Sequence, residues 1–269
     1  MNNPITRGRA AALAFALGAA ILATPAIGAT DVVDIGSLDQ AALASLPSFQ
    51  AANKQLNDYG AGLQKQYLGR AQRASQAEQQ RLANEFQGKM ADRQRQLFGP
   101  LFNKAQVAIA SVASSKNLSV VVDKRIVVVG GTDITNNVRD LLTSVGDPVP
   151  PVSTPPPSKV GYVDQSAIDQ TPKVKSATEA FVKFKQDQDK IAADKLKAAK
   201  TTADRDTVLK DYRKTLDDKQ NQTLKPVIDS TRSAISDVAK SKGLILVVDK
   251  GNIVFGGQDI TKDVTDKLK

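Results

Sequence analysis

The sequence predicts an α+β protein made of two tandem repeats, each a small three-stranded sheet body with a projecting antiparallel α-helical hairpin, a coiled-coil-like arm. Three observations predict this fold class. The segment Val121–Thr135 returns 126 positions later as Val247–Thr261, and a gapless alignment of 24 positions around it has 13 identities. Long stretches with apolar residues every three or four positions precede each copy. A proline-rich segment separates the two halves, so the chain reads as a duplication with a linker.

Each half is predicted to hold three strands. An apolar opening strand spans Val32–Leu38 in the first half and Val160–Asp164 in the second. The repeated motif adds two short strands joined at Lys124 or Lys250, because Val, Ile and Phe at this density favour pleated backbone. A glycine pair after each second strand permits the turn that ends it.

The arms are predicted from helical spacing that runs outward, breaks at a polar stretch and returns. The outward runs begin after Pro47 and Pro172, and two runs joined by a polar break are most simply an antiparallel helical hairpin. The returning runs pass Pro100 and Pro226, where the missing amide proton should kink or restart the helix.

Carboxylates within the motif are interpreted as turn and cap residues, with catalytic acids as the alternative. These four are Asp123, Asp133, Asp249 and Asp259. Thr135 and Thr261 are predicted to be the N-caps of the last helix in each half.

The first 29 residues have the composition of a secretory signal peptide. Arg7 and Arg9 precede an apolar run, Ala10–Ala23, that is short for a bilayer span, and cleavage is expected after Ala29. A retained membrane anchor is the alternative. The resulting boundaries are residues 1–29 for the signal peptide, 30–147 for the first repeat, 148–158 for the Pro-rich linker and 159–269 for the second repeat.

Composition narrows the function. The chain has no Cys, His or Trp, which removes the usual nucleophile–base pairs, zinc ligands and thiol chemistry. An oxygen-ligand metal site and a Ser-Lys pair are the alternatives that this composition leaves open, but no spacing in the chain favours either. We therefore expect no enzyme activity, no cofactor and no metal site. The net charge of +9 would favour anionic partners, but expected export and the lack of aromatic stacking platforms argue against nucleic acid.

Several motifs are similar to those of the Skp periplasmic chaperone family, also called OmpH-like. They are VDIGSLDQ at Val33–Gln40, SVASSKNLSVVVDK at Ser111–Lys124, DVAKSKGLILVVDK at Asp237–Lys250 and the two DIT segments. The resemblance implies a trimeric β-rich body whose helical arms enclose unfolded outer-membrane proteins in the periplasm without ATP. Family members usually carry one copy per chain and longer arms, so the tandem form departs from the pattern. The family's lipopolysaccharide-binding basic residues have no matching motif at the arm tips.

The apolar stripe of each arm either closes the hairpin or contacts a client protein. The candidate client-binding residues are Leu63, Tyr67, Phe86, Met90, Ile191, Leu196, Val208 and Tyr212. Basic residues near the tips either steer acidic clients, touch anionic lipid or simply solubilise the arms. They are Arg70, Arg73, Arg81, Lys195, Lys197, Lys200 and Arg205. The main alternative to a chaperone is a non-enzymatic envelope scaffold or adaptor, in which a stiff linker spaces two partners.

Overall fold

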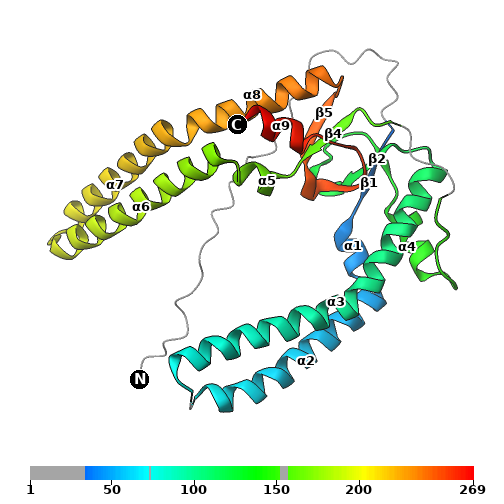
Figure 1. The fold of residues 1–269 in the computed structure, drawn as a ribbon, viewed down its shortest axis with the longest axis horizontal. Coiled ribbons are helices and arrows are strands. Elements are labelled where there is room, and N and C mark those ends of the chain that lie inside the picture. The colour runs from blue at the N-terminus through cyan, green and yellow to red at the C-terminus, as the bar shows by residue number, and fades with distance from the viewer. Residues whose placement is uncertain (1–33, 73, 152–156) are drawn as a thin grey trace.

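The computed structural model describes residues 34–72, 74–151 and 157–269. Within them the chain is mostly helical with two small sheets, so the predicted α+β class is confirmed (Figure 1). The expected signal peptide, Arg73 and the centre of the Pro-rich linker lie outside these residues.

The elements of the two halves follow one another in the same order with two differences: α7 and α8 of the second half stand where the first has α3, and the second half has one additional strand, β6. The first half contains β1 (Ile35–Leu38), α1 (Gln40–Ala44), α2 (Pro47–Ala71), α3 (Gln76–Ser115), β2 (Val120–Asp123), the 3-10 turn η1 (Lys124–Ile126), β3 (Thr132–Asp133) and α4 (Thr135–Thr143). The second contains β4 (Val160–Val163), α5 (Gln165–Asp169), α6 (Pro172–Ala198), α7 (Thr202–Thr223), α8 (Lys225–Ser241), β5 (Leu246–Asp249), η2 (Lys250–Asn252), β6 (Ile253–Gly256), β7 (Gln258–Asp259) and α9 (Thr261–Lys267).

The sheets combine parallel and antiparallel pairs. In one sheet the order is β3-β1-β2-β6, with β1 parallel to both β2 and β3 and with β6 antiparallel to β2. In the other the order is β5-β4-β7, and both pairs are parallel. A helical hairpin follows the opening strand and supplies the crossover that a parallel pair needs.

The prediction of two motif strands per half was partly wrong. The last strand of each half, β3 or β7, is a two-residue segment directly after the glycine pair, where the sequence predicts a turn. The second of the two predicted motif strands does not form in the first half, where it would cover residues 127–130. Its counterpart β6 does form, but it joins the sheet of the other half, giving that sheet four strands. Strand pairing between residues so far apart in the chain is decided by tertiary contacts, which local composition does not encode.

The two sheets also share a cluster of buried side chains. Val120 and Val122 of the first half lie against Val160 of the second, and Leu246 and Ile253 pack around them. The sheet bodies are therefore joined by side-chain packing as well as by β6, whereas the sequence had suggested two separate bodies.

The interpretation of the motif carboxylates as turn and cap residues is confirmed, but the prediction that the threonines are N-caps was wrong. Asp133 Oδ1 accepts hydrogen bonds from the amide of Thr135 at 2.9 Å and from its hydroxyl at 2.6 Å. Asp259 Oδ1 accepts from the Thr261 amide at 2.9 Å. Each threonine is the first residue of its helix, and its hydroxyl accepts the amide proton of Asp39 or Asp164, the N-caps of α1 and α5. The N-cap position itself is occupied by Ile134 or Ile260, which makes no side-chain hydrogen bond, so the aspartate before it satisfies the first helical amide by reaching two residues forward.

The two prolines act differently. Pro100 lies inside α3, which stays helical across it and changes direction along its length (Figure 1). Pro226 lies in the first turn of α8, directly after α7 ends, so the second arm has a helix break where the first has a bend. Both outcomes fit the prediction of a kink or a restart, because a proline lacks the amide proton that the preceding turn needs.

Candidate functional site

Two helical hairpins project from the sheets and are the largest feature of the molecule. α2 packs antiparallel to α3, and α6 packs antiparallel to α7, and the two arms lie apart on the same side of the body in Figure 1. The outward helices have 25 and 27 residues, so each arm is roughly 40 Å long at about 1.5 Å per residue. The predicted helical hairpins are confirmed in both halves.

The outer part of the first arm has an apolar core of its own. Leu63 and Tyr67 of α2 and Leu82 of α3 are buried together, and Phe86 and Met90 pack against them. The Tyr67 and Phe86 rings meet edge to face with centroids 5.9 Å apart. The four predicted client-binding residues of this arm therefore contact one another in the closed hairpin.

Cationic groups cover this core from outside. The Arg70 guanidinium lies 5.7 Å and the Lys89 ammonium 5.5 Å from the centroid of the Tyr67 ring. Lys89 also pairs with Glu85 at 2.8 Å, and this contact lowers the pKa of Glu85 and raises the pKa of Lys89. Arg70, expected to steer clients, is thus exposed but held over an aromatic face.

The second arm is joined by polar contacts instead. The Tyr212 hydroxyl of α7 donates to Asp189 of α6, and Lys185 pairs with the same carboxylate at 2.8 Å. Lys185 chiefly, with Tyr212, lowers the pKa of Asp189. Among the described residues of this arm, Phe181 is the one buried apolar side chain of α6, and α7 has none. Leu196 and Val208 are half-buried, and 45% of Ile191 is exposed.

Sequence equivalence explains the difference between the arms. α2 and α6 both begin at a proline, and counting from it places Gln188 and Ala192 where the first arm has Leu63 and Tyr67. The second arm therefore lacks the two large side chains that α2 contributes to the buried cluster. An amide and a methyl group cannot replace the apolar surface of Leu and Tyr.

The base of the first arm, like its outer part, has larger apolar side chains than the equivalent part of the second arm. In the first half Phe49, Phe98 and Phe102 form a cluster with ring centroids 5.8 to 6.4 Å apart. The repeat alignment places Val174, Leu224 and Ile228 at these positions in the second half.

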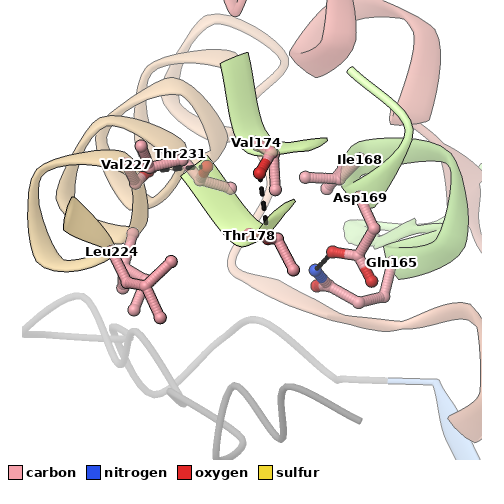
Figure 2. A pocket seen from close by; sticks show the side chains of 9 residues that line it. Gln165, Ile168, Asp169, Val174, Thr178, Leu224, Val227 and Thr231 are labelled. Carbon is pink, nitrogen blue, oxygen red and sulfur yellow. Dashed lines mark hydrogen bonds between the residues drawn. The ribbon is translucent and has the colours of Figure 1, made fainter. Parts of the chain in front are cut away.

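A cavity of about 30 Å³ lies among the smaller side chains of the second base. Figure 2 shows Val174 and Leu224 at its wall, with Thr178 and Thr231 already donating to backbone carbonyls at 2.9 Å. Gln165 likewise donates to Asp169 at 2.7 Å. The cavity has space for about one water molecule, so it marks looser packing and is too small for a ligand.

The aromatic cluster of Phe49, Phe98 and Phe102 at the base of the first arm was not predicted from the sequence. Its signal was present, because Phe98 and Phe102 are four residues apart and continue the helical spacing of α3. Phe102 keeps 53% of its surface exposed, so this cluster also presents an apolar face to solvent.

The predicted basic residues lie on the surface of the arms wherever the structure describes them. Arg70, Arg81, Lys195, Lys197, Lys200 and Arg205 are all exposed. Lys197 pairs with Asp194 at 3.4 Å, and both side chains are largely solvated. Exposed pairs of this kind contribute little to stability, because solvent screens them.

The described residues offer no group of three or more acidic side chains placed to hold a metal ion. Nor does any helix in that part of the chain have the length and apolar character needed to cross a membrane.

The fold and its arms define the class: an α+β protein with sheet bodies that carry projecting two-helix arms. A family model described as "Outer membrane protein (OmpH-like)" matches residues 64–142 and 205–268, just over half of the chain. The chain belongs to this OmpH-like family, whose members are periplasmic, non-enzymatic chaperones that bind unfolded outer-membrane proteins and oligomerise. No curated protein and no solved structure matches the chain significantly.

Each matched segment runs from an arm to the last helix of its half. The first begins in α2 and ends in α4, and the second begins in α7 and ends next to α9. The family model thus meets the chain twice, which is consistent with a tandem arrangement.

Proposed function

We propose that this protein is an ATP-independent holdase of the periplasm that binds unfolded outer-membrane proteins and prevents their aggregation. The observation that carries the proposal is the pair of two-helix arms projecting from the sheets of a chain in the OmpH-like family. A free arm exposes two helical faces along its whole length, which suits contact with an extended polypeptide.

The chemistry of the client fits this geometry. An unfolded β-barrel protein exposes alternating apolar segments that pair edge to edge and aggregate in water. Many weak contacts along two arms would bind such a chain multivalently and release it readily. Holding without folding needs no bound nucleotide, because mass action alone favours the complex over the free unfolded chain.

We assign the first contact with a client to the second arm. Ile191 is exposed there, and Leu196, Val208 and Tyr212 are half-buried, so their apolar surface is reachable without opening the hairpin. In the first arm Leu63 and Tyr67 are buried and would reach a client only after α2 and α3 separate, whereas Phe86 and Met90 are half-buried. On the outer surface of the first arm, Leu68 and Phe102 of the aromatic base are exposed and could contact a client directly.

The basic residues of the tips are proposed to attract acidic clients, anionic lipid or lipopolysaccharide. Long-range attraction between exposed charges falls with ionic strength, since the Debye length shrinks from about 10 Å at 0.1 M to about 3 Å at 1 M salt. Capture rates measured by stopped-flow fluorescence should therefore fall as salt is added. Rates independent of salt would remove this role from the arms.

Export and self-association complete the proposal. A signal peptide over residues 1–29, with cleavage after Ala29, would deliver the repeats 30–147 and 159–269, joined by the linker 148–158, to the periplasm. The family oligomerises, and a trimer is the count that the resemblance implies for this chain.

An aggregation assay tests the holdase. A denatured outer-membrane protein is diluted from urea into buffer with an equimolar amount of this protein, and light scattering is followed. Protection is expected, and it should fall when Ile191→Asp and Leu209→Asp remove exposed apolar surface from the second arm. The matched control is Val145→Asp, which changes an exposed valine away from the arms and should leave protection intact.

The envelope scaffold gives the opposite result. A protein that only spaces two partners would leave the scattering of the diluted client unchanged at every ratio. Absence of protection by the unmodified protein would therefore overturn the holdase and favour the scaffold.

A further inference from the structure

The two central strands of the repeats have different neighbours. β2 pairs with β1 on one side and with β6 on the other, and all four of its residues are buried. β5 is its counterpart, yet among the described residues it pairs with β4 alone. Its Leu246, Val247 and Val248 are half-buried and Asp249 is exposed. The second sheet therefore has an open edge where the first is covered.

The missing neighbour of β5 has a counterpart elsewhere in the chain. β6 covers β2, and its Val254 and Phe255 pack on the core of the first half. The equivalent first-half segment is 127–130, VVVG, in which 89% of Val128 and 90% of Val129 are exposed. The second half thus has an open sheet edge, at β5, with no further strand paired to it. The first half has an apolar segment, 127–130, that is paired with no sheet edge.

The backbone of the segment 127–130 already has the shape of β6 at its end. Gly256 has φ +70°, and a Cβ there would lie 2.2 Å from the Ser119 carbonyl oxygen, so glycine allows the close approach of β6 to β2. Gly130 has φ +84°, and a Cβ there would meet nothing within 4 Å. In the second half the left-handed glycine is needed because β6 approaches β2 closely. The first half has the same left-handed glycine although no strand forms there.

We propose that the segment 127–130 of one chain pairs with β5 of a second copy, repeating between chains the antiparallel contact that β6 makes with β2. Transferring the observed register by the repeat offset places Gly130 opposite Leu246, Val129 opposite Val247 and Val127 opposite Val248. Val128 and Val129 then cover the core around Val247, as Val254 and Phe255 cover the core around Val121.

A second copy is the occupant that the arrangement favours. Within one chain β6 is already used. Val127 and Leu246 of β5 pack on the same buried cluster around Val160, but the segment 127–130 and β5 do not pair as strands. The free donor and the free acceptor are complementary rather than identical surfaces, which makes a head-to-tail contact that closes into a ring when the rotation permits. Added strands gain main-chain hydrogen bonds, and an open edge with apolar residues is otherwise an aggregation site.

This inference deepens the self-association in the proposed function and does not depend on client holding. A monomeric protein could still protect a client, and an oligomer could fail to do so. The experiment therefore contains no client.

Disulfide trapping tests the register, because the natural chain has no cysteine. The variant Val129→Cys with Val247→Cys is oxidised mildly and run on a non-reducing gel. Covalent dimers or larger species are expected. The matched pair Val121→Cys with Phe255→Cys occupies the equivalent observed contact and should cross-link within one chain, with no increase in mass.

Native mass provides the second measurement. The purified protein should have a mass of two or more chains, and Val128→Asp with Val129→Asp should reduce it to one chain without changing the far-UV circular dichroism, since both side chains are exposed in the single chain. A single-chain mass for the unmodified protein would overturn the proposal. So would a Val129–Val247 cross-link formed only within one chain, or an unchanged mass in the aspartate variant. Pairing of β5 with a client strand alone would appear as a single-chain mass here.

Discussion

The two arms share a sequence plan but differ in how their helices are held together. The first has a buried cluster near its tip and three phenylalanines at its base. The second has a tyrosine–aspartate hydrogen bond along the arm, a cavity of about 30 Å³ at its base and a helix break beside that cavity. Regions with few buried apolar contacts open at low free-energy cost. The two arms therefore share a shape but differ in how much buried apolar surface holds their helices together.

The largest effect is expected at the arm bases. Phe98→Ala removes a ring from the packed cluster of the first base and should lower the free energy of unfolding by about 3–5 kcal/mol. Leu224→Ala at the equivalent position lies beside the existing cavity and should cost about 2 kcal/mol, because fewer contacts are lost there. Urea titrations followed by circular dichroism measure both. Equal losses would show that the two bases are packed alike.

A second effect is expected near the tips. Leu82→Ala removes a buried member of the first-arm cluster, and a loss of about 2–3 kcal/mol would speed hydrogen exchange of neighbouring α2 and α3 amides roughly 30- to 150-fold. Val208→Ala is the matched variant in the second arm, where the side chain is half-buried, and should speed exchange of α6 and α7 by less than about tenfold. A larger effect in the second arm would reverse the comparison.

Filling the cavity should bring the second base closer to the first. Val174→Ile adds one methylene at the cavity wall and should raise the free energy of unfolding by about 1 kcal/mol. Val138→Ile is the control, because this valine is fully buried in the core of the first half, and an added methylene there should cost about 1–3 kcal/mol. Loss of stability in the Val174 variant would mean that the cavity walls cannot accommodate the extra group.

The smallest effect concerns an ion pair that the two halves arrange differently. Lys124 pairs with Asp133 at 2.6 Å, whereas Lys250 pairs with Asp164 at 2.9 Å. The Lys124 contact, followed by the Thr135 hydrogen bonds, lowers the pKa of Asp133 from 3.8 to about 2. A lowered folded-state pKa means that the carboxylate stabilises the fold above about pH 4 and that this contribution disappears as the pH falls toward 2.

Asp133→Asn should therefore cost under about 1 kcal/mol at pH 7, since the side chain is 44% exposed and solvent screens the pair. The difference from the unmodified protein should shrink between pH 4 and pH 2 in urea titrations. Asp259→Asn is the control, because the lysine of its half pairs with Asp164 and the substitution removes no equivalent ion pair. A difference that grows as the pH falls would contradict the assignment of the ion pair.

Local patterns were enough to predict much of the architecture. Apolar spacing located both hairpins, Pro47 and Pro172 marked their first turns, and the carboxylates of the repeated motif were recognised as caps. These features depend on residues within a few positions of one another, so they are present in any short window of the sequence. The candidate client-binding residues were located on the arms in the same way, but spacing alone does not distinguish a stripe that closes a hairpin from one that faces a partner.

Two segments with similar sequences show what local patterns cannot predict. Residues 127–130 and β6 are both apolar runs ending in a glycine pair, yet one is largely exposed and the other crosses to the sheet of the opposite half. A strand needs a neighbouring edge to satisfy its backbone, and which edge is free depends on how the two halves meet. The helical hairpins, the opening strands and the role of the motif aspartates before the last helix of each half followed from the amino-acid sequence alone. The crossing of β6 to the other sheet, the open edge of β5 and the unequal packing of the arms were decided by tertiary structure. They depend on contacts between residues that lie far apart in the chain.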